Sequence, residues 1–351
     1  MKHRSPPHFG RFPSGLRSRS QGAALLAAML TVTLVATFAA SALWQQWRGV
    51  EVETAERARV QSAWILIGAL DWSRLILIED YNAGGAAGAD HLAEPWAVPL
   101  EEARLSTFLA ADRNVVQQDD AGSDTSDAFL SGQVTDLQSR LNLATLVNGS
   151  ADTQDVQDQF ARLFARLGLA RAELDALVAA LRQAQPPGED KNQGQPSDQQ
   201  PNAPLMPQTL EQLTWLGVSP TTVAALAPYA TLLPDPATRM NINTAEATVL
   251  MAGIEGLDEA GANKLMAVRQ LQPFRSVQDA KDLLGSNSSA QLTETLHDTR
   301  SSYFEVRGRL RLRDVTVHER SLVHRVGRTV TTLQRERGAA VLASAAPGLP
   351  P

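Results

Sequence analysis

The sequence predicts an α+β protein in which one long N-terminal helix packs on a small antiparallel sheet and a large all-helical insertion separates the strands. Three observations predict this class. An uncharged apolar run from Ala23 to Trp44 continues into residues 47–81, where apolar residues recur mostly at intervals of three and four, which predicts one helix from about Ala23 to about Tyr81. Residues 303–337 alternate with a period of two, which is typical of half-buried antiparallel strands. Between them, residues 152–183 and about 208–284 return to helical spacing.

The first helix begins as an apolar segment of membrane length. The 22 residues from Ala23 to Trp44 carry no charge, and at about 1.5 Å per residue they span roughly 33 Å, the thickness of a bilayer core. A secretory leader usually has an apolar region of about 7–15 residues, so the length favours an anchor that is retained. Ala40-Ser41-Ala42 is an acceptable signal-peptidase site. A cleaved periplasmic protein starting at Leu43 is therefore an alternative.

Charge is distributed unevenly along the chain. The net charge is −6, yet residues 1–22 carry five basic and no acidic side chains, so the part after Trp44 carries −11. Basic residues flank the cytoplasmic side of membrane helices, which predicts a cytoplasmic N-terminus and an external body. An acidic body argues against general nucleic-acid binding. The absence of cysteine excludes disulfides, thiol nucleophiles and cysteine-based zinc sites.

Short strands are expected on both sides of the helical insertion. RLSTFLA (104–110) and AFLSGQVTDLQSRLNL (128–143) have strand character, and QQDDAGSDTSD (117–127) between them is an acidic loop. The segment 183–204 is polar and rich in proline and glycine, which indicates a linker or a surface loop.

A helix that is first a membrane anchor and then the spine of a domain, capped by a small antiparallel sheet, resembles the type IV pilin architecture. Pilin-like precursors are cut after a glycine that follows a short basic leader. Here Arg17, Arg19 and Gly22 precede the apolar run. The resemblance implies that a prepilin peptidase cleaves between Gly22 and Ala23 and that Ala23 is N-methylated.

The chain departs from the pilin pattern at Ala27. Most pilins carry glutamate at this fifth mature position, inside the bilayer. A carboxylate in hydrocarbon is expensive unless it is paired, and in pilin filaments it is thought to meet the N-terminal amine of the subunit assembled just before it. A subunit that enters first has no predecessor and gains nothing from the acid.

Four stretches, in this order, resemble the minor pseudopilin K family of the type II secretion system. They are DHLAEPWAVPL (90–100), GQVTDLQSRLNLATL (132–146), residues 239–285 and SYFEVRGRLRL (302–312). The resemblance implies a single-pass inner-membrane protein with a periplasmic body. No H-E-x-x-H, G-x-S-x-G or Walker pattern occurs in the sequence, so no enzymatic activity is expected. The resemblance also implies assembly with the minor pseudopilins I and J at the tip of the pseudopilus. The major pseudopilin and secreted substrates are further partners to consider.

The expected domain organisation follows from this resemblance and from the pattern. It comprises a leader (1–22), a transmembrane part of the first helix (23–44), the first part of a pilin-like domain (45–142), a first helical subdomain (143–238) with its linker (183–204), a helix-hairpin-helix or SAM-like subdomain (239–300), the closing strands (301–337) and a tail (338–351).

The helix-hairpin-helix pattern raises a rival function, that of a membrane-tethered DNA receptor of natural competence. DNA-binding hairpins read G-[IV]-G, and their backbone N–H groups hold a phosphate at a helix N-terminus. Here the turn is Gly256-Leu257-Asp258-Glu259, which aims two carboxylates at the place of the phosphate, and residues 239–285 carry a net charge of −1. No nucleic-acid partner is expected.

Within this subdomain, Asn243-Thr244 is expected to start a helix. The residues expected in its core are Ile254, Leu257, Leu265, Val268, Leu271, Phe274, Val277 and Leu283.

Calcium is the one cofactor to consider, because the K pseudopilin family includes calcium-binding members. Calcium takes six to eight oxygen ligands. The acidic loop offers Asp119, Asp120, Asp124 and Asp127, although their spacing is not that of an EF-hand, and a solvated loop is the simpler interpretation.

The six histidines, at positions 3, 8, 91, 297, 318 and 324, form no recognisable catalytic pattern and are expected to be surface or packing residues. A ladder of arginines at 307, 309, 311 and 313 would lie on one face of a strand. A solvated face is favoured over a docking surface for an acidic partner.

Overall fold

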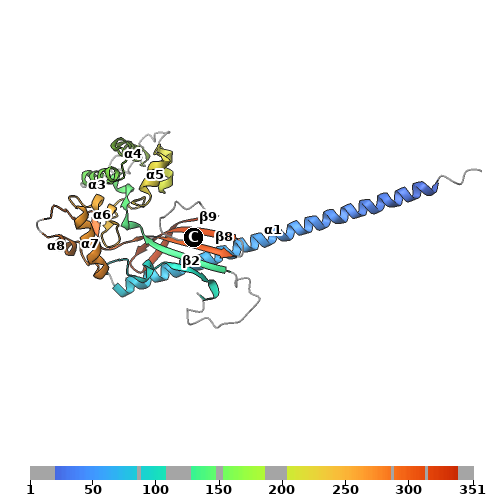
Figure 1. Cartoon of the computed structure of the whole chain (residues 1–351), viewed down its shortest axis with the longest axis horizontal. Coiled ribbons are helices and arrows are strands. Elements are labelled where there is room, and N and C mark those ends of the chain that lie inside the picture. Colours follow the sequence, from blue (N-terminus) through green and yellow to red (C-terminus); the bar gives the residue numbers. More distant parts are fainter. Residues whose placement is uncertain are drawn as a thin grey trace, which may run out of the picture. The chain divides into compact units, whose positions relative to one another are not determined.

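The computed structural model describes residues 20–84, 88–107, 128–147, 153–185, 204–285, 288–312 and 315–338 (Figure 1). The chain divides into two compact units, Met1–Gln61 and Ser62–Pro351. The combination of one long helix, an antiparallel sheet and many further helices confirms the predicted α+β class.

Helix α1 is continuous over 65 residues, Ser20–Gly84. From residue 22 to residue 61 nearly every described side chain is exposed. From Ser62 onward one face becomes buried at intervals of three and four residues, which is the period of an amphipathic helix. The buried positions are Ser62, Leu66, Leu70, Ser73 and Leu77.

The sheet has five antiparallel strands in the order β1-β2-β7-β8-β9. Strands β2, β8 and β9 are labelled in Figure 1. The strands of the sheet come from both sides of the helical insertion, as the sequence predicts. Their bounds are β1 Leu100–Arg104, β2 Ala128–Asp136, β7 Tyr303–Leu312, β8 Val315–Val326 and β9 Thr329–Gly338. The second half of α1 packs on this sheet through a core of Leu70, Leu77, Trp96, Val134, Phe304, Val306, Val323 and Val330.

The strand predicted at 104–110 is wrong in position. The strand in this part of the chain is Leu100–Arg104, residues 105–107 are helical, and the rest of the predicted strand lies outside the described residues. The reason is visible in the spacing, because the apolar side chains here recur at i, i+3 and i+4, as in a helix. They are Leu105, Phe108 and Leu109.

The strand predicted at 128–143 is interrupted. Strand β2 ends at Asp136, whose carboxylate accepts a hydrogen bond from the backbone N–H of Gln138 and starts the 3₁₀ turn η3 (Leu137–Ser139). Only the two-residue β3, Leu141–Asn142, follows.

The helical insertion is built from short helices around one large hydrophobic cluster. The helices are α3 Thr153–Arg166, α4 Arg171–Ala184, α5 Pro220–Leu226, α6 Ala247–Gly253, α7 Glu259–Leu271 and α8 Val277–Leu284. Two 3₁₀ turns, η4 Leu143–Val147 and η5 Leu210–Leu216, accompany them, while a further one, η2 Pro95–Ala97, lies between α1 and β1. Two parallel bridges tie its ends together, β3 with β4 (Ala230–Thr231) and β5 (Met240–Asn241) with β6 (His297–Asp298).

The two halves of the insertion share hydrogen bonds as well as a core. Helix α6 ends at Gly253, where its last carbonyls need partners. Gln159 and Arg162 of α3 supply them, with Gln159 Nε2 at 2.7 Å from the Gly253 oxygen and Arg162 Nε at 2.8 Å from the Ala252 oxygen. Polar side chains of α3 therefore cap α6.

The predicted helix start at Asn243-Thr244 is wrong, since α6 begins at Ala247. Tertiary hydrogen bonds recruit both side chains. The Asn243 amide donates to the Phe274 carbonyl at 2.9 Å and accepts from the Phe274 N–H at 3.0 Å. The Thr244 hydroxyl donates to Asp136.

Leu271 is not a core residue, because its side chain is 90% exposed. The buried face of α7 carries Ala262, Leu265 and Arg269. Leu271 lies two residues beyond Arg269, which at about 100° per residue places it on roughly the opposite side of the helix.

Candidate functional site

In the part of the chain that the structure describes, α1 is the one helix long and apolar enough to cross a membrane. Gly22, Ala23 and Ala27 all lie in its exposed first part. Three threonine hydroxyls in this part are satisfied within the helix, which suits a hydrocarbon environment. Thr31, Thr33 and Thr37 each donate to the carbonyl three residues earlier, at 2.8–2.9 Å.

Two tryptophans mark the end of the uncharged stretch. The rings of Trp44 and Trp47 lie 5.4 Å apart between centroids, and Arg48 follows. Tryptophan is enriched at the membrane–water interface because its ring is amphipathic. This part of α1 thus has the features of a membrane anchor, including its boundary.

Arg325 of β8 fastens the far end of α1 to the sheet. It is 7% exposed and donates from Nη1 to Asp80 Oδ2 at 2.8 Å, from Nη2 to the Ser301 carbonyl at 2.9 Å, and to Asp90. Its guanidinium also lies over the Phe304 ring, 4.9 Å from the centroid. Burial lowers the pKa of Arg325, but the two carboxylates outweigh it and the net shift is upward.

Glu94 lies beside this ion pair in the chain segment that follows α1. Its Oε2 accepts from Trp96 Nε1 at 2.6 Å and from the His91 N–H at 3.0 Å. Burial raises the pKa of Glu94 to about 8. Among the described residues, Asp80, Asp90 and Glu94 are the one acidic group close enough to share a cation, with ligand oxygens within 4.8 Å. The Arg325 guanidinium already binds two of them, so the arrangement is an ion pair rather than a metal site.

Asp136 is the second buried carboxylate that joins distant segments. It accepts four hydrogen bonds, from Ser301 Oγ at 2.6 Å, Thr244 Oγ1 at 2.5 Å, Asn241 Nδ2 at 3.2 Å and the Gln138 N–H at 2.8 Å. Burial raises the pKa of Asp136 to about 6, while the hydrogen bonds from Ser301, Thr244 and Gln138 act to lower it. This cluster fixes the end of β2 to the helical insertion and to the start of β7.

The sequence contains a signal for both carboxylates. Asp90 and Asp136 are the aspartates of the two elements, 90–100 and 132–146, that carry the family resemblance. The pattern did not reveal their roles, because their partners lie as far away as Arg325 and Ser301 in the sequence.

The hairpin turn is tightly packed, and one N–H group at the start of α7 is capped by a side chain of the turn. Gly256 has a φ of 72°, and a Cβ there would lie 2.2 Å from the Ser289 carbonyl oxygen. Ser289 also donates to the Gly256 carbonyl at 2.9 Å. The Asp258 carboxylate accepts from the Gly261 N–H at 2.7 Å, so the N-terminus of α7 is capped from within. Leu257 is buried and Glu259 begins α7.

Each described histidine has a packing or hydrogen-bonding role. His297 bonds to the Thr293 and Gly253 backbone, and His324 stacks on Tyr303 at 4.3 Å. His318 pairs across the strands with Arg309, and His91 lies 3.7 Å from Glu94. The residues considered for calcium, Asp119, Asp120, Asp124 and Asp127, lie outside the described residues.

The arginine ladder is partly neutralised on its own sheet face. Arg311 bonds to Glu102 at 2.9 Å and lies over the Phe129 ring at 4.2 Å, and Arg307 pairs with Glu305 at 2.5 Å. The Arg311 contacts link β7 to β1 and β2, whereas Arg307 and Glu305 lie on the same strand. Arg313 lies outside the described residues.

Comparisons with known proteins point in one direction. Two family models described as type II secretion system protein K match residues 139–235 and 240–300. Type II secretion system protein K of Pseudomonas aeruginosa is 27% identical over 336 residues, covering 91% of this chain and 90% of that protein. The protein of the same name from Pectobacterium carotovorum is 25% identical over 347 residues, covering 92% and 98%.

A solved structure shares the fold. The crystal structure of the GspK-GspI-GspJ complex from the enterotoxigenic Escherichia coli type 2 secretion system contains a chain that matches with a TM-score of 0.54. That match has 16% sequence identity and covers 82% of this chain and 99% of the other.

Proposed function

The chain belongs to the protein K family of the type II secretion system, and from this premise we propose that it is a minor pseudopilin at the tip of the periplasmic pseudopilus. In this role it assembles with the minor pseudopilins I and J, and it helps to initiate or cap the filament during export across the outer membrane. The solved relative with the same fold is described as part of a GspK-GspI-GspJ complex. The role is structural rather than catalytic.

The observation that carries the proposal is that α1 combines a stretch of membrane length with a part that packs on the sheet. One helix is uncharged over a bilayer thickness, from Ala23 to Trp44, and becomes the sheet-packed spine of a domain from Ser62 onward. A filament subunit needs both properties in one helix, because it is first anchored in the membrane and is then extracted from it, as one piece, into the filament.

A tip position is supported by Ala27. A subunit inside the filament has a neighbour whose N-terminal amine can neutralise a carboxylate in the bilayer, and a first subunit has none. The helical insertion, expected over residues 143–300, supports the same position. It adds bulk to one pilin-like scaffold, which a tightly wound filament accommodates at its end more easily than in its interior.

The proposed topology places the N-terminus in the cytoplasm and the body in the periplasm, because residues 1–22 are exclusively basic among charged residues. Prepilin peptidase would cleave between Gly22 and Ala23 and leave an N-methylated Ala23. The major pseudopilin and secreted substrates are further candidate partners of the tip.

Intact mass and N-terminal sequencing of the mature protein from membranes test this proposal. We expect a start at Ala23 with one added methyl group. The variant Gly22→Val should stay unprocessed, and Ala42→Val, which damages the alternative signal-peptidase site, should be processed like the natural sequence. A start at Leu43 that Ala42→Val abolishes would contradict the proposal.

Co-purification tests the partnership. A tagged chain expressed with the I and J minor pseudopilins of the same system should retain both after extraction in mild detergent. Recovery of the chain alone, at normal abundance and with correct processing, would argue against a stable tip complex.

A further inference from the structure

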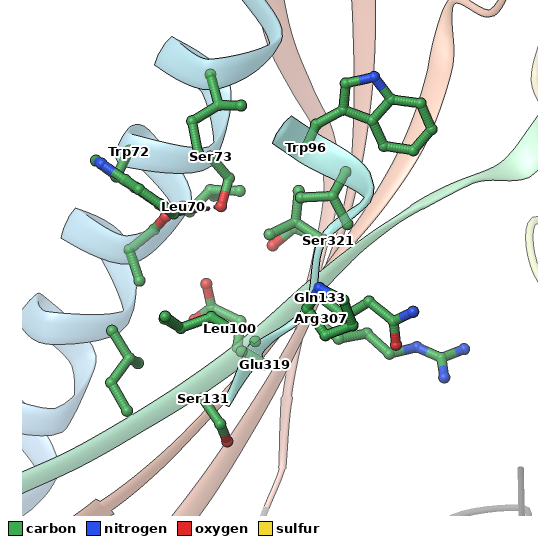
Figure 2. Close-up of a pocket in the computed structure, with 18 of the residues that line it drawn as sticks. Leu70, Trp72, Ser73, Trp96, Leu100, Ser131, Gln133, Arg307, Glu319 and Ser321 are labelled. Atoms are coloured by element: carbon green, nitrogen blue, oxygen red, sulfur yellow. Dashed lines mark hydrogen bonds between the residues drawn. The ribbon is translucent and has the colours of Figure 1, made fainter. Parts of the chain in front are cut away.

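A cavity of about 220 Å³ lies between α1 and the sheet in the second unit of the chain. Figure 2 shows α1 on one side and the strands on the other, with Leu70 and Ser73 projecting from the helix. Most of the lining is apolar. It includes Leu66, Leu70, Ile76, Trp96, Leu130 and Val306.

Two glycines hollow out the floor of this cavity. Gly132 of β2 and Gly308 of β7 lie directly opposite each other in the sheet. A Cβ at Gly308 would lie 3.1 Å from Leu66 Cδ2, so this backbone position faces α1. The neighbouring cross-strand pairs of β2 and β7 place leucine and valine side chains under the helix, whereas the pair Gly132–Gly308 places none there.

One end of the cavity is polar. Ser321 of β8 is 1% exposed, and its Oγ has no hydrogen-bond partner among the described residues. Glu319 lies two residues away on the same face (Figure 2). Its carboxylate is already bound by Arg337 at 2.9 Å and by Arg335 at 3.2 Å. The buried serine hydroxyl is therefore the unsatisfied group at this end, and leaving such a group unpaired is unfavourable.

The cavity has an apolar opening. Val98 and Trp72 belong to its lining, yet they are 65% and 39% exposed. A ligand can therefore enter between α1 and the segment around Pro99 without unfolding either.

We propose that this cavity binds a small neutral ring that carries one hydroxyl group, which is the chemistry of a phenol. An apolar cavity of about 150 Å³ is large enough for benzene, so this one has room for a substituted ring. The ring would contact the leucines and tryptophans, and its hydroxyl would pair with Ser321. A charged ligand does not fit, because the apolar lining would desolvate it and the Glu319 charge is already neutralised.

This inference goes beyond the proposed function and does not depend on it. A phenol can arrive as a free small molecule or as the tyrosine side chain of a partner protein. The binding chemistry is the same for both, and the test distinguishes them.

The test uses the full-length protein in lipid nanodiscs, with methyl-labelled leucine and valine observed by NMR. It is titrated with p-cresol and with toluene, which lacks only the hydroxyl. We expect saturable shifts at Leu70 and Val306 and none at Leu75, which is 63% exposed on the same helix and outside the cavity lining. p-Cresol should bind more tightly than toluene.

Variants separate the hydroxyl contact from simple partition into apolar space. Ser321→Ala should lower the affinity for p-cresol by up to about tenfold, which is the equivalent of one net hydrogen bond. The affinity for toluene should not change. Ala69→Phe or Ser321→Leu should fill the cavity and abolish both responses, with circular dichroism as the check of folding. No saturable shift at Leu70 and Val306, or a Ser321→Ala variant with an unchanged preference for p-cresol, would overturn the inference.

The same titration on the assembled complex with the I and J pseudopilins identifies the source. If p-cresol still binds, the ligand is a free small molecule. If Leu70 and Val306 are shifted in the complex before any addition and no longer respond, a partner side chain occupies the cavity.

Discussion

Arg325 of β8 and Asp80 of α1 form a buried ion pair between the sheet and the helix, with Nη1 at 2.8 Å from Oδ2. Asp80 lies near the end of α1, and Arg325 lies on β8, 245 residues later. Together with the hydrophobic core between α1 and the sheet, this ion pair holds the helix to the strands. The ion pair therefore supports both the stability of the domain and its proposed use as a filament subunit.

Replacing Arg325 by methionine should destabilise the domain by about 3–5 kcal/mol, because Asp80 and Asp90 would remain buried without their counter-charge. Denaturant unfolding of the full-length protein in detergent, followed by tryptophan fluorescence, measures the loss. Arg328→Met is the matched control, since Arg328 is exposed in the following turn and should change stability by less than about 0.5 kcal/mol. Equal effects of both variants would contradict a structural role for the buried pair.

Asp136→Asn should also be destabilising, by about 2–3 kcal/mol. The new amide would present N–H donors to groups that themselves donate, the Ser301 and Thr244 hydroxyls. The size and shape of the side chain hardly change, so the loss reports the hydrogen bonds and not the packing. The exposed Asp71→Asn serves as the comparison, and thermal unfolding by circular dichroism measures both.

Glu94 should make the protein less stable as the pH rises. An acid in a salt bridge has the opposite effect, because its pKa is lowered in the folded state. The pKa of Glu94 is about 8 in the folded protein and near 4.5 when exposed. The folded state therefore holds a proton that the unfolded state has lost, and stability from this group declines as pH rises from about 4.5 through about 8.

The variant Glu94→Gln isolates this effect. Glutamine resembles the protonated acid and can still accept from Trp96 Nε1. The free energy of unfolding of Glu94→Gln, relative to that of the natural sequence, should be higher at pH 9 than at pH 5. Denaturant unfolding at both pH values measures this difference. A difference that does not change with pH would show that Glu94 is ionised in the folded protein.

The sequence predicts the elements whose signals are local. The helical period from Ala23 to about Tyr81 and the alternation through 303–337 correspond to α1 and to β7–β9. In α1 one face is buried from Ser62 onward, and in β8 alternate residues are buried, so in these stretches the period is repeated often enough to be read. The domain boundaries, the processing site and calcium binding stay predictions.

The sequence predicts the bounds of short helices and strands less well, because tertiary contacts determine where these elements start and end. Asn243 and Thr244 have the character of a helix start, but Phe274 and Asp136 bind their side chains. Strand β1 is placed by its pairing with β2 and not by its own alternation. The buried polar contacts of Asp136 and Asp90 are not predictable from the sequence pattern for the same reason. Ser301 lies 165 residues from Asp136, and Arg325 lies 235 residues from Asp90.

Substitutions at Ala27 and at its neighbour Ala28 test the tip position. Ala27→Glu restores the residue that most pilins carry, and Ala28→Glu places the same charge one residue later, where no pilin partner is expected. Ala27 is the fifth residue of the uncharged run, so a carboxylate there should cost less than the about 2.5–3.5 kcal/mol that insertion scales give at the helix centre. If the subunit enters the filament first, no neighbouring amine relieves the carboxylate introduced by Ala27→Glu. Both variants should then reduce secretion of a type II substrate equally in a strain lacking the natural protein. Normal secretion with Ala27→Glu and loss with Ala28→Glu would mean that the carboxylate at position 27 finds an amine, and hence that another subunit precedes this one.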